Sequence, residues 1–186
     1  MTDVPDTTWN GTLRSGLAVT VRSVRPDDRE RIATAFRNLD KASVYTRMFS
    51  YKAALSDSEL DRMVNVDPRR EVALVVTTGA GADETIIATA RYIEFEPQAG
   101  KRAAEVAFVV EEDYQGQGIA GRLLGALARR ARANGVERFE AEVLTENRAM
   151  LAVFAKSGMP MSRRQDGDVV HVALSLEPSP ESPGAQ

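Results

Sequence analysis

The sequence predicts a single α/β domain in which a mixed, mostly antiparallel sheet is flanked by helices. Three strand-like runs follow one another with only short turns between them, at residues 71–78, 85–95 and 103–110. Such short connections make the three strands antiparallel neighbours. Helix-like and strand-like patterns alternate over the rest of the chain, which adds helical layers to one sheet. The chain has 186 residues, of which 43% are hydrophobic, enough for one domain with a core.

The N-terminal part is predicted to form a hairpin and two helices. Residues 12–26 form the hairpin around a Ser-Gly turn. A helix follows Pro26, because apolar residues recur there at helical spacing: Ile32, Ala35, Phe36 and Leu39. A second helix begins at Ser56, whose side chain can form a capping box with Glu59.

The C-terminal half is predicted to add two helices and two strands. A long helix spans residues 119–133, has one apolar side, and ends at an Asn-Gly pair. A strand over residues 138–144 and a helix over residues 147–158 follow it. A strand over residues 169–176 closes the domain.

The domain is predicted to occupy residues 12–176, between a loose segment over residues 1–11 and a disordered tail over residues 177–186. The tail is rich in Pro, Ser and Gly and has no apolar face. The start of the chain lacks the basic and apolar regions of a signal peptide. No apolar run approaches the roughly 20 residues of a membrane span. We therefore expect a cytoplasmic protein without a membrane partner.

Composition excludes several kinds of site. Without cysteine the chain has no disulfide, no thiolate metal site and no cysteine acyl-enzyme. The single histidine, His171, leaves little room for a multi-histidine site, so we expect no metal. A net charge of −3 and a pI of about 5.4 argue against nucleic acid as the main partner.

The segment GQGIAG, residues 116–121, matches the G-x-G-x-x-G pattern of dinucleotide-binding loops. In those loops the strand runs almost directly into the first glycine and the motif opens its domain. Here the apolar strand stops at Val110, and the polar linker EEDYQ intervenes. About 110 residues precede the motif, and too few follow to complete that fold. This interpretation is therefore disfavoured.

The alternative pattern is Q-x-x-G-x-A, formed by Gln115, Gly118 and Ala120. Small residues let a ligand touch the backbone. Successive N–H groups and the positive end of the following helix then face a diphosphate. A strand, a polar loop and a long amphipathic helix in this order favour the second pattern.

The stretch AFVVEEDYQGQGIAGRLLGAL resembles motif A of the GNAT N-acetyltransferases, the strand–loop–helix that holds acetyl-CoA. TENRAMLAVFAKSGM is similar to the asparagine-bearing helix of that family, and the resemblance covers roughly residues 17–176. VRPDDRERIATAF, SVYTRMFS, AEVAFVV and GVERFEAEVLTENRAM resemble bacterial protein lysine acetyltransferases of the Pat type. The resemblance implies a GNAT fold whose sheet is splayed at the acetyl-CoA site. It also implies acetyl-CoA as cosubstrate and a protein partner that presents a lysine.

The resemblance further implies which residues bind the coenzyme. The strand that pairs with the pantetheine arm contains Phe108, Val109 and Val110, and an N–H near Val109 or Val110 polarises the thioester carbonyl. Asn147 contacts the arm. Phe154 is expected to be a core residue that also packs on the coenzyme, at a position where many relatives have a tyrosine that acts as general acid. The glutamine of the Q-x-x-G-x-A pattern and the loop expected to hold the pyrophosphate complete the set: Gln115, Gly116, Gln117, Gly118, Ile119, Ala120 and Gly121.

Two carboxylates are candidates for the general base that takes the proton of the acceptor amine. Glu105 matches the glutamate with this role in Pat-type enzymes, and strand alternation puts it on one face with Ala107 and Val109. Glu142 matches the base of some N-terminal peptide acetyltransferases and is the second candidate. An aromatic pair between the first two helices, Tyr45 and Phe49 near Arg47 and Met48, could flank a lysine stem.

Three functions remain open on the sequence. The first is acetylation of a protein lysine, and the second is acetylation of a small amine. A non-catalytic acyl-CoA sensor is the third. A deep acidic pocket favours a small cation as acceptor, whereas an open groove favours a folded protein.

Overall fold

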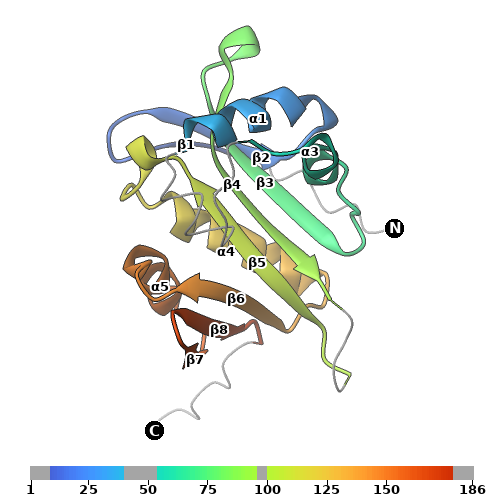
Figure 1. Cartoon of the computed structure of the whole chain (residues 1–186), viewed down its shortest axis with the longest axis vertical. Helices are drawn as coiled ribbons and strands as arrows, with labels where there is room; N and C mark the ends of the chain where they lie inside the picture. The colour runs from blue at the N-terminus through green and yellow to red at the C-terminus, as the bar shows by residue number, and fades with distance from the viewer. Residues whose placement is uncertain (1–8, 40–53, 96–99, 178–186) are drawn as a thin grey trace, which may run out of the picture.

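The computed structural model describes residues 9–39, 54–95 and 100–177. They form one eight-stranded sheet with the strand order β1-β2-β3-β4-β5-β6-β8-β7 (Figure 1). Only β5 and β6 pair in parallel, so the sheet is mixed and mostly antiparallel, as predicted. The strands are β1 (Trp9–Thr12), β2 (Ala18–Ser23), β3 (Glu71–Thr78), β4 (Thr85–Glu94), β5 (Ala103–Val110), β6 (Arg138–Leu144), β7 (Met161–Asp166) and β8 (Val169–Ser175).

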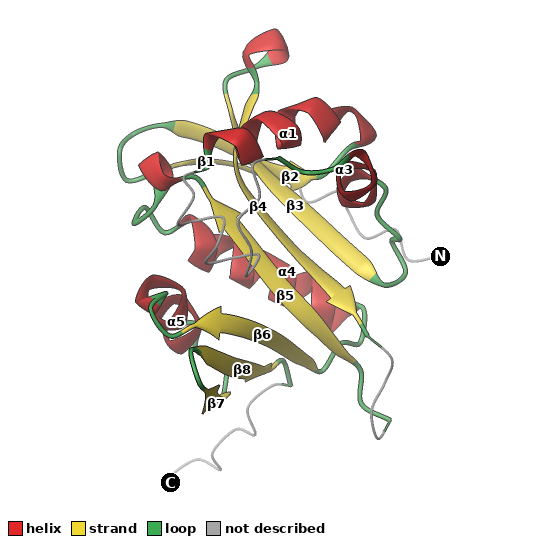
Figure 2. Cartoon of the chain, viewed as in Figure 1, coloured by secondary structure: helices red, strands yellow, loops and turns green. Residues whose placement is uncertain are grey.

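Helices cover both faces of the sheet. The α-helices of the described residues are α1 (Arg29–Asn38), α3 (Asp57–Val64), α4 (Ile119–Ala133) and α5 (Arg148–Ala155). Helices α1 and α3 pack on one face against Val75 and Ile86. Helix α4 covers the other face, where the larger core cluster gathers around Tyr92, Leu123 and Phe139, and it passes behind β5 in Figure 2. We call the face that carries α1 and α3 the front face.

Several local predictions are confirmed. The Ser56 and Glu59 side chains form the capping box at the start of α3. Helix α4 ends at Asn134, and Gly135 follows with a left-handed φ of 78°. Strand β1 begins at Trp9, so the last residues of the segment predicted as loose belong to the sheet. Residues 1–8 and 178–186 lie outside the described residues.

Strand β7 is absent from the prediction. Its sequence, MSRRQD, lacks alternation of apolar and polar residues, because this edge strand exposes nearly every side chain. Backbone pairing with β8 holds it in place.

The sheet forks between β5 and β6. These strands pair only from Ala103 to Glu105 on β5, opposite Arg138 to Glu140 on β6. Strand β5 then continues to Val110 without a partner on that side. Figure 1 shows the two strands diverging from this point. Glu105 is therefore the last paired residue, at the vertex of the fork.

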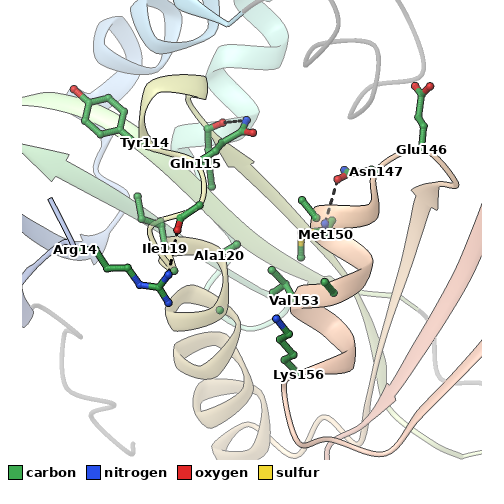
Figure 3. A pocket seen from close by; sticks show the side chains of 16 residues that line it. Arg14, Tyr114, Gln115, Ile119, Ala120, Glu146, Asn147, Met150, Val153 and Lys156 are labelled. Atoms are coloured by element: carbon green, nitrogen blue, oxygen red, sulfur yellow. Dashed lines mark hydrogen bonds between the residues drawn. The ribbon is translucent and has the colours of Figure 1, made fainter.

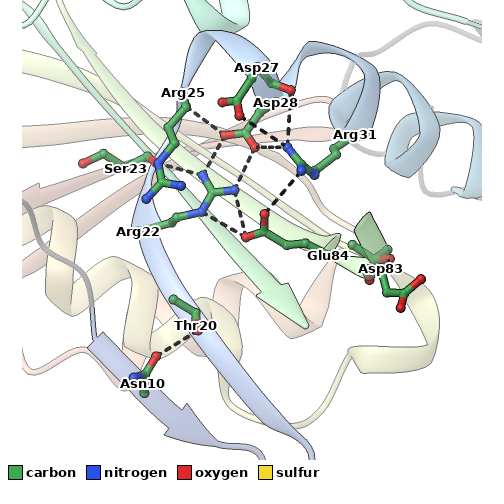
Figure 4. A network of polar contacts seen from close by, with 11 residues as sticks. Asn10, Thr20, Arg22, Ser23, Arg25, Asp27, Asp28, Arg31, Asp83 and Glu84 are labelled. Atoms are coloured by element: carbon green, nitrogen blue, oxygen red, sulfur yellow. Dashed lines mark hydrogen bonds and ion pairs between the residues drawn. The ribbon is translucent and has the colours of Figure 1, made fainter. Parts of the chain in front are cut away.

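A buried ionic network fixes the start of α1 to the sheet (Figure 4). The Arg22 guanidinium on β2 donates two hydrogen bonds to the Asp28 carboxylate, at 2.7 and 2.8 Å. Arg22 also donates to Glu84 in the β3–β4 turn at 3.0 Å, and the Arg25 backbone N–H donates to Asp28 at 2.8 Å. Arg22 is 2% exposed and Asp28 is fully buried. The network joins the end of β2 and the nearby start of α1 to the β3–β4 turn, which lies 62 residues from Arg22 in sequence.

The network predicts a loss of stability in acid. Burial alone would raise the pKa of Asp28, but its hydrogen bonds with Arg22 and Arg25 and the charges of Arg22 and Arg31 outweigh it and lower the pKa. Burial alone would also raise the pKa of Glu84, but hydrogen bonds with Arg22 and Thr77 and the charges of Arg22 and Arg31 lower it. Stability from a carboxylate with a lowered pKa is present above its unfolded value, about 4, and is lost as pH falls through the folded pKa.

We therefore expect the free energy of unfolding to fall steeply below about pH 4. Denaturant titrations from pH 6 to pH 3 measure this. Asp28→Asn cannot ionise at that position and should show a weaker pH dependence. Equal stability of the unaltered protein at pH 6 and pH 3 would contradict the prediction.

Candidate functional site

A cavity of about 650 Å³ lies at the wide end of the fork. The end of β5, the glycine loop, the first turn of α4 and one side of α5 line it (Figure 3). The lining includes many of the residues predicted to bind a coenzyme: Val110, Gln115, Gly116, Gly118, Ile119, Ala120, Gly121 and Asn147. Residues predicted from one short motif and from a distant helix therefore meet in one cavity.

The glycine loop exposes its backbone to this cavity. Gly116 and Gly118 have φ angles of 73° and 83°, in the left-handed region that favours glycine. A Cβ atom at Gly116, Gly118 or Gly121 would meet no atom within 4 Å, so open space lies beside each of them. The Gln115 side chain donates to the Val110 carbonyl at 3.1 Å and holds the loop against β5.

Gly118 is the N-cap of α4, and no side chain caps that helix end. The first N–H groups of a helix have no partner within the helix, and the helix dipole makes this end positive. Free amides, a positive helix end and open space fit a diphosphate. The observed geometry therefore suits a phosphorylated ligand.

The backbone of β5 provides a second row of polar groups. The Glu111 N–H donates to the Ile87 carbonyl at 3.0 Å, which continues the β4–β5 ladder. Because ladder groups alternate, Val109 turns its backbone toward β4, whereas Phe108 and Val110 turn theirs into the fork. Of the two amides predicted to polarise a thioester, that of Val110 faces the fork.

Helix α5 forms the opposite wall. The Asn147 side-chain oxygen accepts a hydrogen bond from the Met150 N–H at 3.1 Å and caps the helix. The side-chain NH₂ of Asn147 donates no hydrogen bond to any of the described residues. Phe154 does not line the cavity, because its ring is 1% exposed and packs edge-on against Phe108. Phe154 therefore lies in the core and not at the surface of the cavity, unlike the predicted packing on the coenzyme.

Other predicted residues also lie outside the lining. The Phe108 side chain is buried, and Val109 faces the apolar groove beneath α1 and α3. The Gln117 side chain accepts a hydrogen bond from the Ser15 N–H at 3.2 Å. The residues predicted at the acceptor side, Tyr45, Arg47, Met48 and Phe49, lie outside the described residues.

Both candidate bases lie on the front face. A hollow of about 830 Å³ there is lined by Glu105, Glu140 and Glu142 together with residues of β7 and β8. None of the described helices covers β6, β8 and β7 in Figure 2. The Glu142 carboxylate lies 3.3 Å from Nδ1 of His171.

Charged neighbours surround the two sites. Burial and the charge of Arg62 lower the pKa of Arg91 on β4, and the nearby Glu105 carboxylate opposes this shift. A guanidinium therefore lies within electrostatic reach of Glu105. In the loop after β5, burial and the charges of Asp113 and Glu112 raise the pKa of Glu111. None of these three loop carboxylates lines the cavity.

Sequence reasoning missed several lining residues. Ala149, Ala152, Val153 and Lys156 share one side of α5 at helical spacing, so the pattern could have identified them. Arg14 reaches the cavity from the β1–β2 turn, more than 100 residues away, and no local signal identifies it.

A sheet that forks beside an uncapped helix N-terminus is the arrangement expected of a coenzyme A-dependent acyltransferase. The chain belongs to the acetyltransferase (GNAT) family, whose model matches residues 37–159. Enzymes of this family use acetyl-CoA. The mostly antiparallel topology differs from that of a dinucleotide-binding fold, as the linker between β5 and the glycines predicted.

Similarity to two Pat proteins exceeds 30% identity over the aligned residues. It is 34% identical over 166 residues to acetyltransferase Pat of Mycolicibacterium smegmatis, covering 89% of this chain and 48% of that protein. The chain thus spans about half the length of Pat. The GNAT domain of S. lividans PAT is 31% identical with a TM-score of 0.79, covering 90% of this chain and 96% of that one.

The fold is also shared with more distant structures. That of yncA from Salmonella typhimurium, solved with acetyl-CoA, has a TM-score of 0.68 at 18% identity, covering 90% of this chain and 99% of that one. Among the described helices, none is long and apolar enough to cross a lipid bilayer. The described residues also contain no cluster of three His, Asp or Glu side chains suited to a metal ion.

Proposed function

We propose that this protein transfers the acetyl group of acetyl-CoA directly to the ε-amine of a lysine on a protein, with Glu105 as the general base. The observation that carries the proposal is the position of Glu105 at the vertex of the fork, on the front face of the sheet. The relation to Pat supports a protein as acceptor.

The dimensions of the fork support this route. The glycine loop and α4 hold the diphosphate beside Val110, and Glu105 lies five residues back along β5. At about 3.3 Å per residue this separation is about 17 Å, which a pantetheine arm can span. The inward-facing amides of Phe108 and Val110 then lie along the arm and can pair with it.

The reaction needs few further groups. Acetyl-CoA supplies the activated acyl group when bound. Glu105 accepts the proton of the lysine ammonium, directly or through water, and the neutral amine attacks the thioester carbon. The carbon–sulfur bond then breaks and the thiolate leaves. The attacking nitrogen gives its second proton to water, and water protonates the thiolate. Phe154 cannot donate that proton, and in this account the side chain has only a packing role.

The shape of the acceptor side favours a macromolecule. The hollow around Glu105 is a broad sheet surface that extends over β6, β8 and β7 to the exposed edge strand. A small amine would leave most of this surface exposed to water. A folded protein can cover it while one lysine reaches the vertex of the fork.

The test uses labelled acetyl-CoA, a bacterial lysate and a panel of small amines. Mass spectrometry should locate the label on lysine side chains of proteins. Label on small molecules alone would contradict the protein-lysine proposal and favour the small-amine function. Binding of acetyl-CoA without any acetyl transfer would favour a sensor.

Coenzyme binding should depend on Gly118. Its φ of 83° disfavours any side chain, and a new Cβ would enter the open space where the diphosphate is proposed to lie. We expect Gly118→Val to weaken acetyl-CoA binding by at least about tenfold and to cost about 1–2 kcal/mol of stability. Calorimetric titration and denaturant unfolding measure the two effects.

Gly167→Val is the matched control. Gly167 also has a left-handed φ, 57°, and open space around its Cβ position, but it lies in the β7–β8 turn outside the cavity. The Gly167→Val variant should lose about as much stability as Gly118→Val and keep its affinity for acetyl-CoA. Equal affinity of the two variants would argue against the phosphate site.

A further inference from the structure

The β1–β2 turn forms a wall of the cavity that the glycine motif does not describe. The Arg14 guanidinium donates to the Gly116 carbonyl at 3.4 Å, and Ser15 N–H bonds the Gln117 side chain at 3.2 Å. From α4, the Arg122 guanidinium donates to the Thr12 carbonyl at 3.2 Å. These contacts place the turn against the glycine loop and the first turn of α4.

Two cations line the cavity from opposite sides. Arg14 comes from the β1–β2 turn and Lys156 from the end of α5, with the start of α4 between them (Figure 3). Among the described residues, neither forms an ion pair, and Arg14 uses a single long hydrogen bond of its five possible donors. Both side chains are exposed. Glu146 is the acidic residue of the lining and lies beside Asn147.

Local charge therefore favours an anion more than the overall charge of −3 suggests. The positive end of α4 adds to the two side-chain cations. Coenzyme A carries a diphosphate and a 3′-phosphate, more negative charge than the amides of one helix end neutralise. Guanidinium and ammonium groups are the usual side-chain partners of such oxygens.

We propose that Arg14 and Lys156 bind phosphate groups of the coenzyme and so extend the phosphate site beyond the glycine loop. This inference rests on the proposed function, because it takes acetyl-CoA as the ligand. The β1–β2 hairpin is thereby a part of the coenzyme site, although it is far from the motif in sequence. Selectivity for a phosphorylated coenzyme then comes partly from residues that no motif contains.

Calorimetric titration with acetyl-CoA tests the assignment without any need for an acceptor. We expect Arg14→Gln and Lys156→Gln each to weaken binding roughly threefold to tenfold, since the contacts are exposed. Arg14→Lys should keep part of the affinity. The effect of Arg14→Gln should shrink in high salt, because salt screens exposed charges.

Titration with acetyl-dephospho-CoA identifies the phosphate involved. If Arg14 binds the 3′-phosphate, Arg14→Gln weakens binding of acetyl-CoA and leaves that of acetyl-dephospho-CoA unchanged. If Arg14 instead binds the diphosphate, Arg14→Gln weakens binding of both acetyl-CoA and acetyl-dephospho-CoA. Either result supports the assignment.

Matched controls are Arg129→Gln on the exposed side of α4 and Lys101→Gln before β5, since both residues lie outside the cavity. Unchanged affinity in the Arg14 and Lys156 variants, or an equal loss in the controls, would overturn the assignment. Failure of the unaltered protein to bind acetyl-CoA would instead refute the proposed function.

Discussion

Glu105→Gln is expected to lower the rate of acetyl transfer by about 10²- to 10⁴-fold, the usual contribution of a positioned general base. A lysine amine with a pKa near 10.4 is almost entirely protonated at pH 7, so the reaction depends on a group that removes this proton. The amide of glutamine keeps the size of the side chain but cannot accept a proton. Because Glu105 lies on the front face and outside the coenzyme cavity, acetyl-CoA binding should be unchanged.

The pH profile separates a base from a structural role. As pH rises toward the pKa of the amine, more of the acceptor is already neutral, so the deficit of Glu105→Gln should narrow. Initial rates of label transfer from pH 7 to pH 10, with the affinity for acetyl-CoA measured in parallel, provide the test. Full turnover by the variant across this range would remove Glu105 as the base.

Glu140→Gln is the matched control for this experiment. Glu140 lies directly opposite Glu105 in the β5–β6 register, lines the same hollow and forms an ion pair with Arg138. Its loss should change the rate by less than about tenfold, because it has no proposed part in proton transfer. Glu142→Gln tests the second candidate, whose carboxylate is already close to His171.

Asp28→Ala is expected to lower the free energy of unfolding by about 3–5 kcal/mol, the usual cost of breaking a buried ion pair. The substitution leaves the Arg22 guanidinium buried without its bidentate partner and removes the acceptor of the Arg25 N–H. Domains of this size have about 5–15 kcal/mol of stability, so the loss is a large part of the total. Denaturant unfolding and the melting temperature measure it.

Asp27→Ala provides an adjacent control. Asp27 is exposed, and its contact with Arg31 is long at 3.9 Å, so its removal should cost less than about 1 kcal/mol. Similar losses of stability for the two variants would mean that the buried Asp28–Arg22 pair contributes no more than the exposed Asp27–Arg31 contact. Because the network lies away from the coenzyme cavity, Asp28→Ala should bind acetyl-CoA normally at temperatures where it is folded.

Much of the fold follows from local patterns in the sequence. Three strand-like runs joined by short turns predict an antiparallel meander, and the structure contains β3, β4 and β5 in that arrangement. The capping box at Ser56 and the Asn-Gly end of α4 depend on neighbouring residues alone, which is why they could be predicted. Strand β7 could not, because its side chains face water and its position comes from pairing with β8.

The candidate site also combines residues that local patterns predict with residues that depend on long-range contacts. The glycine loop could be predicted because its function depends on backbone geometry within six residues. Which amide faces the fork depends on the register between β4 and β5, a long-range property. Arg14 depends on a contact across 102 residues, and Phe154 is excluded from the lining by packing against Phe108. Neither relation leaves a signal in a local motif.

The fork gives this sheet an internal edge. A free strand edge on the outside of a protein invites pairing with another chain, which is a hazard of aggregation. Here the free edge of β5 lies between two halves of one sheet, with helices α4 and α5 behind it, so a second polypeptide strand has little room to approach. A slender, flexible molecule with amide groups of its own meets no such obstacle. The architecture can thus leave hydrogen-bonding groups exposed for a ligand while it hinders strand pairing at this edge.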